Sequence, residues 1–69
     1  MTKHYLNDNG SRWYIKINNK SDELNSPFYD EIQWYNFPYY KFPYYVVFDE
    51  DIGIEGVYPT LKRLQEDEN

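Results

Sequence analysis

The chain contains no cysteine and a single histidine, His4. Disulfides and thiolate zinc sites are therefore excluded, and one imidazole cannot by itself form a structural metal centre. Nor is there a run of about 18 apolar residues, and the N-terminus has no apolar stretch of the signal-peptide type. We expect a protein without metal or cofactor that works in the cytoplasm, or in the host cytoplasm if its source is viral.

Side chains suited to catalysis are also scarce. The three serines lie at predicted turns or caps, away from His4, so a serine nucleophile with its base is not expected. The acidic run from Asp49 suggests a calcium loop, but an EF-hand would need glycine and glutamate where the chain has Ile54 and Thr60. So small a chain has little interior left for a pocket that raises a carboxylate pKa. We predict that it is not an enzyme.

Aromatic residues, in contrast, are abundant. Phe, Tyr and Trp make up fifteen of the 69 residues, and eleven of them lie between Phe28 and Phe48. Residues 36–45, NFPYYKFPYY, form a near repeat of six rings and two prolines. A domain of this size cannot hide so many rings, each of which buries roughly 150–250 Å². We predict a semi-rigid aromatic segment that is part core and part contact surface.

Asn9-Gly10 is typical of the two-residue turn of a β-hairpin. A loop of that length pairs Tyr5 with Tyr14, and strand alternation then divides the side chains between two faces. The predicted core face comprises Leu6, Trp13, Ile15 and Ile17. The opposite face, which is basic and carries tyrosines, comprises Lys3, Tyr5, Arg12, Tyr14 and Lys16.

The rest of the chain predicts one more hairpin and two short helices. A polar connector precedes a helix from Ser26-Pro27 to about Asn36. Residues 44–58 form the second hairpin, with a central strand apolar on both faces, a turn at Gly53 and a bulge at Gly56. A last helix follows Pro59, and residues 66–69 are expected to fray as an acidic tail. The fold class is α+β: one domain of residues 1–69, order ββαββα, its small antiparallel sheet covered by helices on one face.

The net charge of −5 is unevenly distributed: residues 1–20 carry +3 and residues 21–69 carry −8. Such an acidic surface repels phosphate backbones and anionic membranes, and it attracts a basic protein surface. We therefore expect a protein-interaction module that docks on a partner with a basic surface. The predicted partner-binding residues are Tyr35, Phe37, Tyr39, Tyr40, Phe42, Tyr44, Asp49, Glu50, Asp51 and Glu55.

Three further hypotheses are open. In composition the chain is similar to inhibitors that phages and mobile elements make against host nucleic-acid enzymes. Some of those inhibitors mimic DNA, and Asp49 and Asp51 at alternate strand positions would lie roughly 6.6 Å apart. The second is a single-strand nucleic-acid-binding module that uses the basic face at Lys3, Arg12, Tyr14 and Lys16. The third is a subunit of a homo-oligomer.

Overall fold

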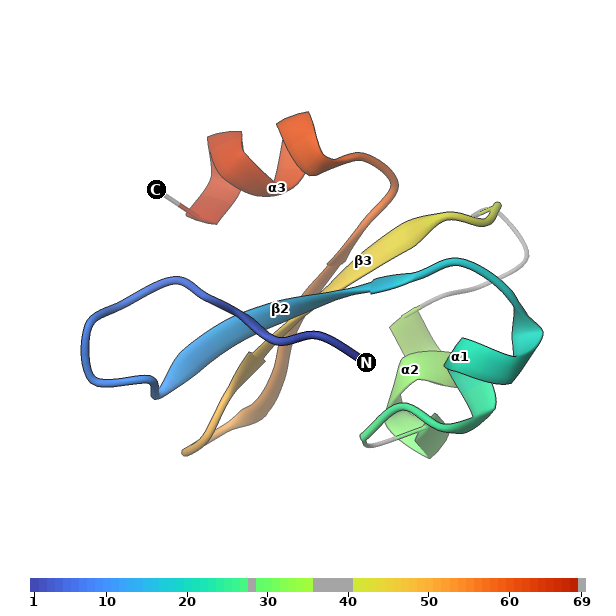
Figure 1. Cartoon of the computed structure of the whole chain (residues 1–69), viewed down its shortest axis with the longest axis horizontal. Helices are drawn as coiled ribbons and strands as arrows, with labels where there is room; N and C mark the ends of the chain where they lie inside the picture. Colours follow the sequence, from blue (N-terminus) through green and yellow to red (C-terminus); the bar gives the residue numbers. More distant parts are fainter. Residues whose placement is uncertain (28, 36–40, 69) are drawn as a thin grey trace.

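Four antiparallel strands form a sheet in the order β1-β2-β3-β4, and helices pack against it (Figure 1). The computed structural model describes residues 1–27, 29–35 and 41–68. In these ranges the strands are β1 (His4–Tyr5), β2 (Arg12–Ile17), β3 (Tyr44–Asp49) and β4 (Gly53–Tyr58), and the helices are α1 (Lys20–Leu24), α2 (Tyr29–Tyr35) and α3 (Leu61–Glu68). The order ββααββα confirms the predicted α+β class, with one helix more than expected.

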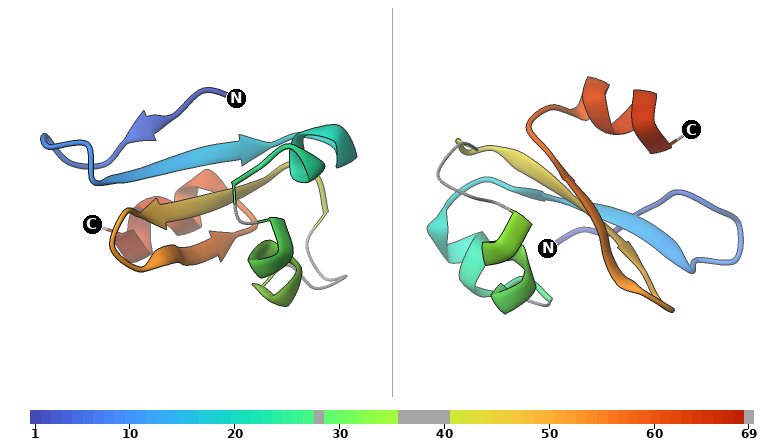
Figure 2. Two further views of the ribbon diagram at one scale, coloured as in Figure 1. Left: turned by 90° about the horizontal axis from the view of Figure 1, so that it is seen from below. Right: turned by 180° about the vertical axis from the view of Figure 1, so that it is seen from behind.

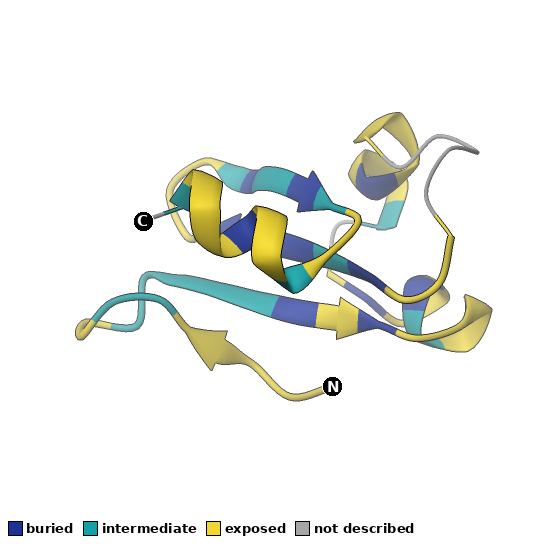
Figure 3. Cartoon of the chain, turned by 90° about the horizontal axis from the view of Figure 1, so that it is seen from above, coloured by how far each residue is buried: buried dark blue, intermediate teal, exposed yellow. Residues whose placement is uncertain are grey.

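Strand β3 is central, as its sequence predicts. Val46 and Phe48 face one side of the sheet and Val47 faces the other, and all three are fully buried. Figure 3 shows the exposed β1 at the edge of the sheet, with β2 between it and the buried β3. The main core lies on the Phe48 side, where Ile15 and Ile17 of β2 pack with residues of β3 and β4.

The helices cover both faces of the sheet, so the prediction of one covered face is wrong. Ile32 of α2 belongs to the main core, which places α2 on the Phe48 side. Glu68 of α3 instead bonds to Arg12, which lies on the opposite side of β2 from Ile15. Figure 2 shows the strands separating α3 from α1 and α2. A strand buried on both faces, such as β3, requires cover on both.

The first hairpin has a longer loop and a shifted register. Tyr5 pairs with Trp13 and His4 with Tyr14, one residue away from the predicted pairing. The amide of Asn7 explains the longer loop, because it accepts from the Arg12 backbone N–H at 3.2 Å and donates to Ser11 Oγ at 2.9 Å. Gly10 does take the positive φ expected of it, 75°. A one-residue slip moves each β1 side chain to the other face of the sheet.

Helix α1 replaces the predicted polar connector. Asn19 is its N-cap and accepts from the Asp22 backbone N–H, while the Asp22 carboxylate accepts from Asn18 N–H. The helix also buries a carboxylate, that of Glu23, which receives hydrogen bonds from Lys20 Nζ and the Tyr44 hydroxyl, each at 2.7 Å. Burial raises the pKa of Glu23, but the hydrogen bonds from Lys20, Tyr44 and Gln33 and the charge of Lys20 together lower it below its usual value.

Helix α2 begins at Tyr29, later than predicted, and ends at Tyr35 as the following Phe-Pro predicts. Ser26 Oγ donates to the Glu23 carbonyl at the end of α1, and its predicted role as the cap of α2 stays a prediction. The predicted turns in residues 36–40 lie outside the described residues.

The second hairpin follows the sequence closely. Gly53 has a φ of 86°, and the β3–β4 register shifts beside Val47 and Phe48, which is the bulge expected near Gly56. Helix α3 is capped by Thr60, whose Oγ1 accepts from Arg63 N–H. It continues through Glu68, so residues 66–68, which we expected to fray, are helical here.

Candidate functional site

Helix α2 presents two aromatic rings and two carboxylates to solvent. Trp34 is 77% exposed and Tyr35 is 49% exposed. Asp30 and Glu31, one turn earlier, are exposed as well. Residues four apart are neighbours on a helix, so Asp30 adjoins Trp34 and Glu31 adjoins Tyr35. We call these four residues the α2 face.

The α2 face extends toward the acidic β3–β4 turn. A Cβ built on Gly53 would lie 3.5 Å from Glu31 Oε2, so this carboxylate reaches the turn. Glu50 and Asp51 are exposed there, next to Ile52, which is 66% exposed. Asp49 is partly buried and accepts from the Asp51 backbone N–H at 2.8 Å. The Glu31 carboxylate thus lies near the start of β4, and the β3–β4 turn adds further exposed carboxylates to the acidic surface.

The described part of the repeat, residues 41–45, contributes one ring to the surface and one to the core. Phe42 is 44% exposed, and its ring stacks on that of Tyr44 at 5.8 Å. Tyr44 is fully buried, so its inclusion among the partner-binding residues is wrong. Its position in β3 pairs it with Ile17 in the core, where its hydroxyl donates to Glu23. Phe37, Tyr39 and Tyr40 lie outside the described residues.

Trp34 was missing from the predicted set although a sequence signal for it existed. In the sequence, Phe28, Ile32 and Tyr35 form an apolar stripe at i, i+4 and i+7 of the predicted helix, and position 34 lies off it, although Tyr35 too is 49% exposed. A tryptophan off the buried stripe of a short helix faces solvent. The most exposed ring on α2 could therefore have been found from helical periodicity.

Glu55 belongs to an ion-pair network under α3 and not to an open acidic surface. Arg12 Nη2 lies 2.9 Å from Glu55 Oε2 and 2.6 Å from Glu68 Oε1. The Tyr58 hydroxyl donates to the other Glu68 oxygen. Glu55 is therefore a partly buried carboxylate that shares Arg12 with Glu68, and its role in partner binding stays a prediction.

The network shifts the pKa of each member. Burial and the neighbouring Glu55 raise the pKa of Glu68, whereas hydrogen bonds from Glu68 and Arg12 lower that of Glu55. Burial and the Glu68 carboxylate raise the pKa of Tyr58. The hydrogen bond to Glu55 raises that of Arg12. The network links β2, β4 and α3, and its member Tyr58 also lines a hollow of about 280 Å³ together with Arg63 and Asp67.

The predicted basic face does not form as one surface. The register shift places Lys3 on the Trp13 side of the sheet, where its Nζ lies 4.5 Å from the centre of the Trp13 ring. Arg12 is held by its two glutamates. Tyr14 and Lys16 keep the predicted side, but Lys16 is exposed and Tyr14 is half-buried. His4 stacks on Tyr14 at 4.7 Å instead, and Tyr14 meets Tyr45 edge to face at 6.2 Å.

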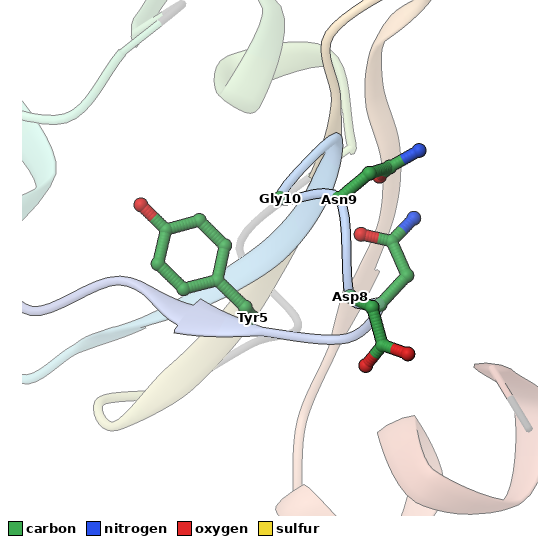
Figure 4. Close-up of a pocket in the computed structure, with 5 residues that line it drawn as sticks. Tyr5, Asp8, Asn9 and Gly10 are labelled. Atoms are coloured by element: carbon green, nitrogen blue, oxygen red, sulfur yellow. The ribbon is translucent and has the colours of Figure 1, made fainter.

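An open hollow of about 650 Å³ lies beside the β1–β2 loop. Figure 4 shows its labelled side chains, Tyr5, Asp8 and Asn9, pointing in different directions rather than toward a common point. The described ranges contain no group of three His, Cys, Asp or Glu side chains placed to hold a metal ion. They also contain no helix with the length and apolarity needed to span a membrane.

Comparison with known proteins gives no guide to this site. The chain matches no family model, no curated protein and no solved structure. Its function is therefore inferred from the side chains described above.

Proposed function

We propose that this protein is an interaction module that docks through the α2 face on a protein partner with a basic surface. The observation that carries the proposal is the exposure of Trp34, at 77%, beside Asp30 and Glu31. Tryptophan and tyrosine contribute strongly to interfaces because they bury a large area at little cost in rotamer entropy.

Charge determines which partners fit. Helix α2 carries two acidic residues and no basic one, and the adjoining β3–β4 turn adds Glu50 and Asp51. A basic surface is attracted to this edge of the molecule, and a phosphate backbone is repelled by it. The acidic surroundings therefore favour a basic protein over nucleic acid as the ligand of the α2 face.

A more specific form of the proposal is an inhibitor of a nucleic-acid enzyme, of the kind that phages and mobile elements make. Its target would offer the α2 face a groove whose basic residues otherwise bind DNA. Carboxylates at Asp30, Glu31, Glu50 and Asp51 would then take the place of phosphates. Duplex DNA would compete with the protein for such a target.

Trp34→Ala should abolish capture of the partner. We expect a protein retained from a host lysate by the wild-type chain to fall at least about tenfold with this variant, because a central tryptophan contributes about 2 kcal/mol or more. Quantitative mass spectrometry of the retained proteins measures the loss. Duplex DNA added to the lysate tests the inhibitor form.

Gln65→Ala is the matched control, since Gln65 is exposed on α3, across the sheet from α2. It should retain the same protein as the wild type, and circular dichroism should show both variants folded. Equal recovery with Trp34→Ala would contradict the proposal. A dimer detected by native mass spectrometry and lost in Trp34→Ala would assign the α2 face to self-association instead.

One observation favours a second candidate, a module for single-stranded nucleic acid. His4, Tyr14 and Tyr45 form a row of rings on one face of the sheet, and Lys16 is exposed beside them. Bases stack on such rows with about 1–3 kcal/mol per base. In this case Tyr14→Ala should weaken the gel shift of a single-stranded oligonucleotide at least about fivefold. The candidate is eliminated if no shift occurs at moderate salt.

A further inference from the structure

The α2 face carries two ring–carboxylate pairs that hold no cation in the described part of the chain. From this arrangement, and resting on the proposed function, we infer that the α2 face binds two arginine side chains from one segment of its protein partner. One arginine would lie over Trp34 and bond to Asp30. The other would lie over Tyr35 and bond to Glu31.

The helical spacing builds both pairs in the same way. Asp30 precedes Trp34 by four residues and Glu31 precedes Tyr35 by four, so each carboxylate lies one turn from a ring. A guanidinium is planar, so it can stack on a ring while its edge donates two hydrogen bonds to a carboxylate. A lysine ammonium supplies only a point charge there. The pairs therefore favour arginine.

The chain itself contains a cation held by a carboxylate and a ring. Lys20 Nζ lies 2.7 Å from Glu23 Oε1 and 5.7 Å from the centre of the Tyr29 ring at the start of α2. A second lysine, Lys3, covers Trp13. These contacts show that ring-bound cations are compatible with the fold.

The α2 face lacks such a contact. Within residues 1–27, 29–35 and 41–68, the ion pairs and cation–ring contacts involve neither its two carboxylates nor its two rings. Trp34 also remains 77% exposed. Four side chains of complementary type are thus available to a partner, and charge complementarity makes that partner basic.

Short peptides test this inference without the natural partner. The probes are serine–glycine peptides with two arginines separated by one residue, and otherwise identical peptides with lysine or citrulline. Each is titrated into the ¹⁵N-labelled chain, and the Trp34 indole N–H and the α2 amides are followed. We expect weak binding, about threefold tighter for arginine than for lysine, and none for citrulline. Binding should fall as salt rises from about 50 to about 500 mM.

Two variants locate the effect. Trp34→Ala and Asp30→Asn should each weaken binding of the arginine peptide about three- to fivefold. Glu66→Gln is the control for Asp30→Asn, since it removes the same charge from an exposed position on α3. It should leave the affinity within about twofold.

Several outcomes would overturn the inference: equal binding of the citrulline peptide, an equal loss in Glu66→Gln, or shifts confined to β2 and β3. A single-stranded oligonucleotide that shifts the Trp34 resonance would overturn it too. A lysate partner lost with Trp34→Ala, combined with no arginine binding, would refute this inference and leave the proposed function standing. Arginine binding, combined with no lysate partner lost with Trp34→Ala, would refute the proposed function and leave the arginine binding of the α2 face standing.

Discussion

Phe48→Ala is expected to leave the chain largely unfolded at room temperature. Phe48 is fully buried near the end of the central strand β3, and its ring stacks on Trp13 at 5.6 Å. Truncating a buried phenylalanine costs about 3–5 kcal/mol, the transfer free energy of the ring plus the cavity it leaves. A domain of this size rarely has more than about 3–5 kcal/mol of stability. Urea unfolding monitored by circular dichroism gives the free energy of unfolding of the wild type and its loss in the variant.

Phe42→Ala provides the comparison, since its ring is 44% exposed just before β3. We expect it to cost less than about 1 kcal/mol. The contrast tests the core assignment, because both residues lie in or beside the same aromatic segment. An unchanged urea midpoint for Phe48→Ala would mean that the core is not where the structure places it.

Arg12→Leu is expected to destabilise the fold by about 2–3 kcal/mol at pH 8 and by less at pH 5. The substitution removes two hydrogen bonds to charged groups and leaves Glu55 and Glu68 facing each other under α3. Two unpaired carboxylates repel when both are ionised. Thermal unfolding of the wild type and the variant across about pH 5–8 measures the difference.

The direction of this pH dependence follows from the directions in which the two glutamate pKa values are shifted. Glu68 has a raised pKa, so its contribution to stability is present at low pH and is lost as the pH rises through that pKa. Glu55 has a lowered pKa, so its contribution is lost as the pH falls. Arg12 is the cation that lowers the pKa of Glu55 and limits the rise in the pKa of Glu68, and the substitution removes it. Between about pH 5 and pH 8 the variant should therefore lose stability relative to the wild type as the pH rises.

A double variant separates this repulsion from the loss of packing. Arg12→Leu with Glu68→Gln removes one of the facing charges, and we expect it to be more stable at pH 8 than Arg12→Leu alone. Its pH dependence should return toward that of the wild type. If the stabilities of the wild type and of Arg12→Leu change with pH in parallel, the network does not couple to folding.

Much of the candidate site could be predicted from the sequence. The acidic excess after residue 20 and the exposure of Tyr35 and Phe42 come from composition and from the excess of rings over core volume. Trp34 lies off the apolar stripe of its helix, so periodicity alone points it outward. The docking role of these residues stays a prediction.

Other parts of the site depend on contacts between residues far apart in the chain. Arg12 and Glu68 are 56 residues apart and Arg12 and Glu55 are 43 apart, so no local pattern shows that these charges pair. Tyr44 likewise leaves the surface because Glu23, 21 residues earlier, accepts its hydroxyl in the core. The burial of Tyr44 and the pairing of Glu55 thus have the same origin, namely contacts between residues far apart in the chain.

The sequence by itself determined the local features: a strand apolar on both faces, a glycine turn at Gly53, the end of α2 before a proline, and an acidic surface with too many rings. Each depends on backbone preferences or on periodicity within a few residues. Tertiary structure decided which face α3 covers, which register β1 adopts and which charges remain free. One long loop closed by Asn7 reverses the faces of a strand, and pairing across the sheet neutralises some charges and leaves others exposed.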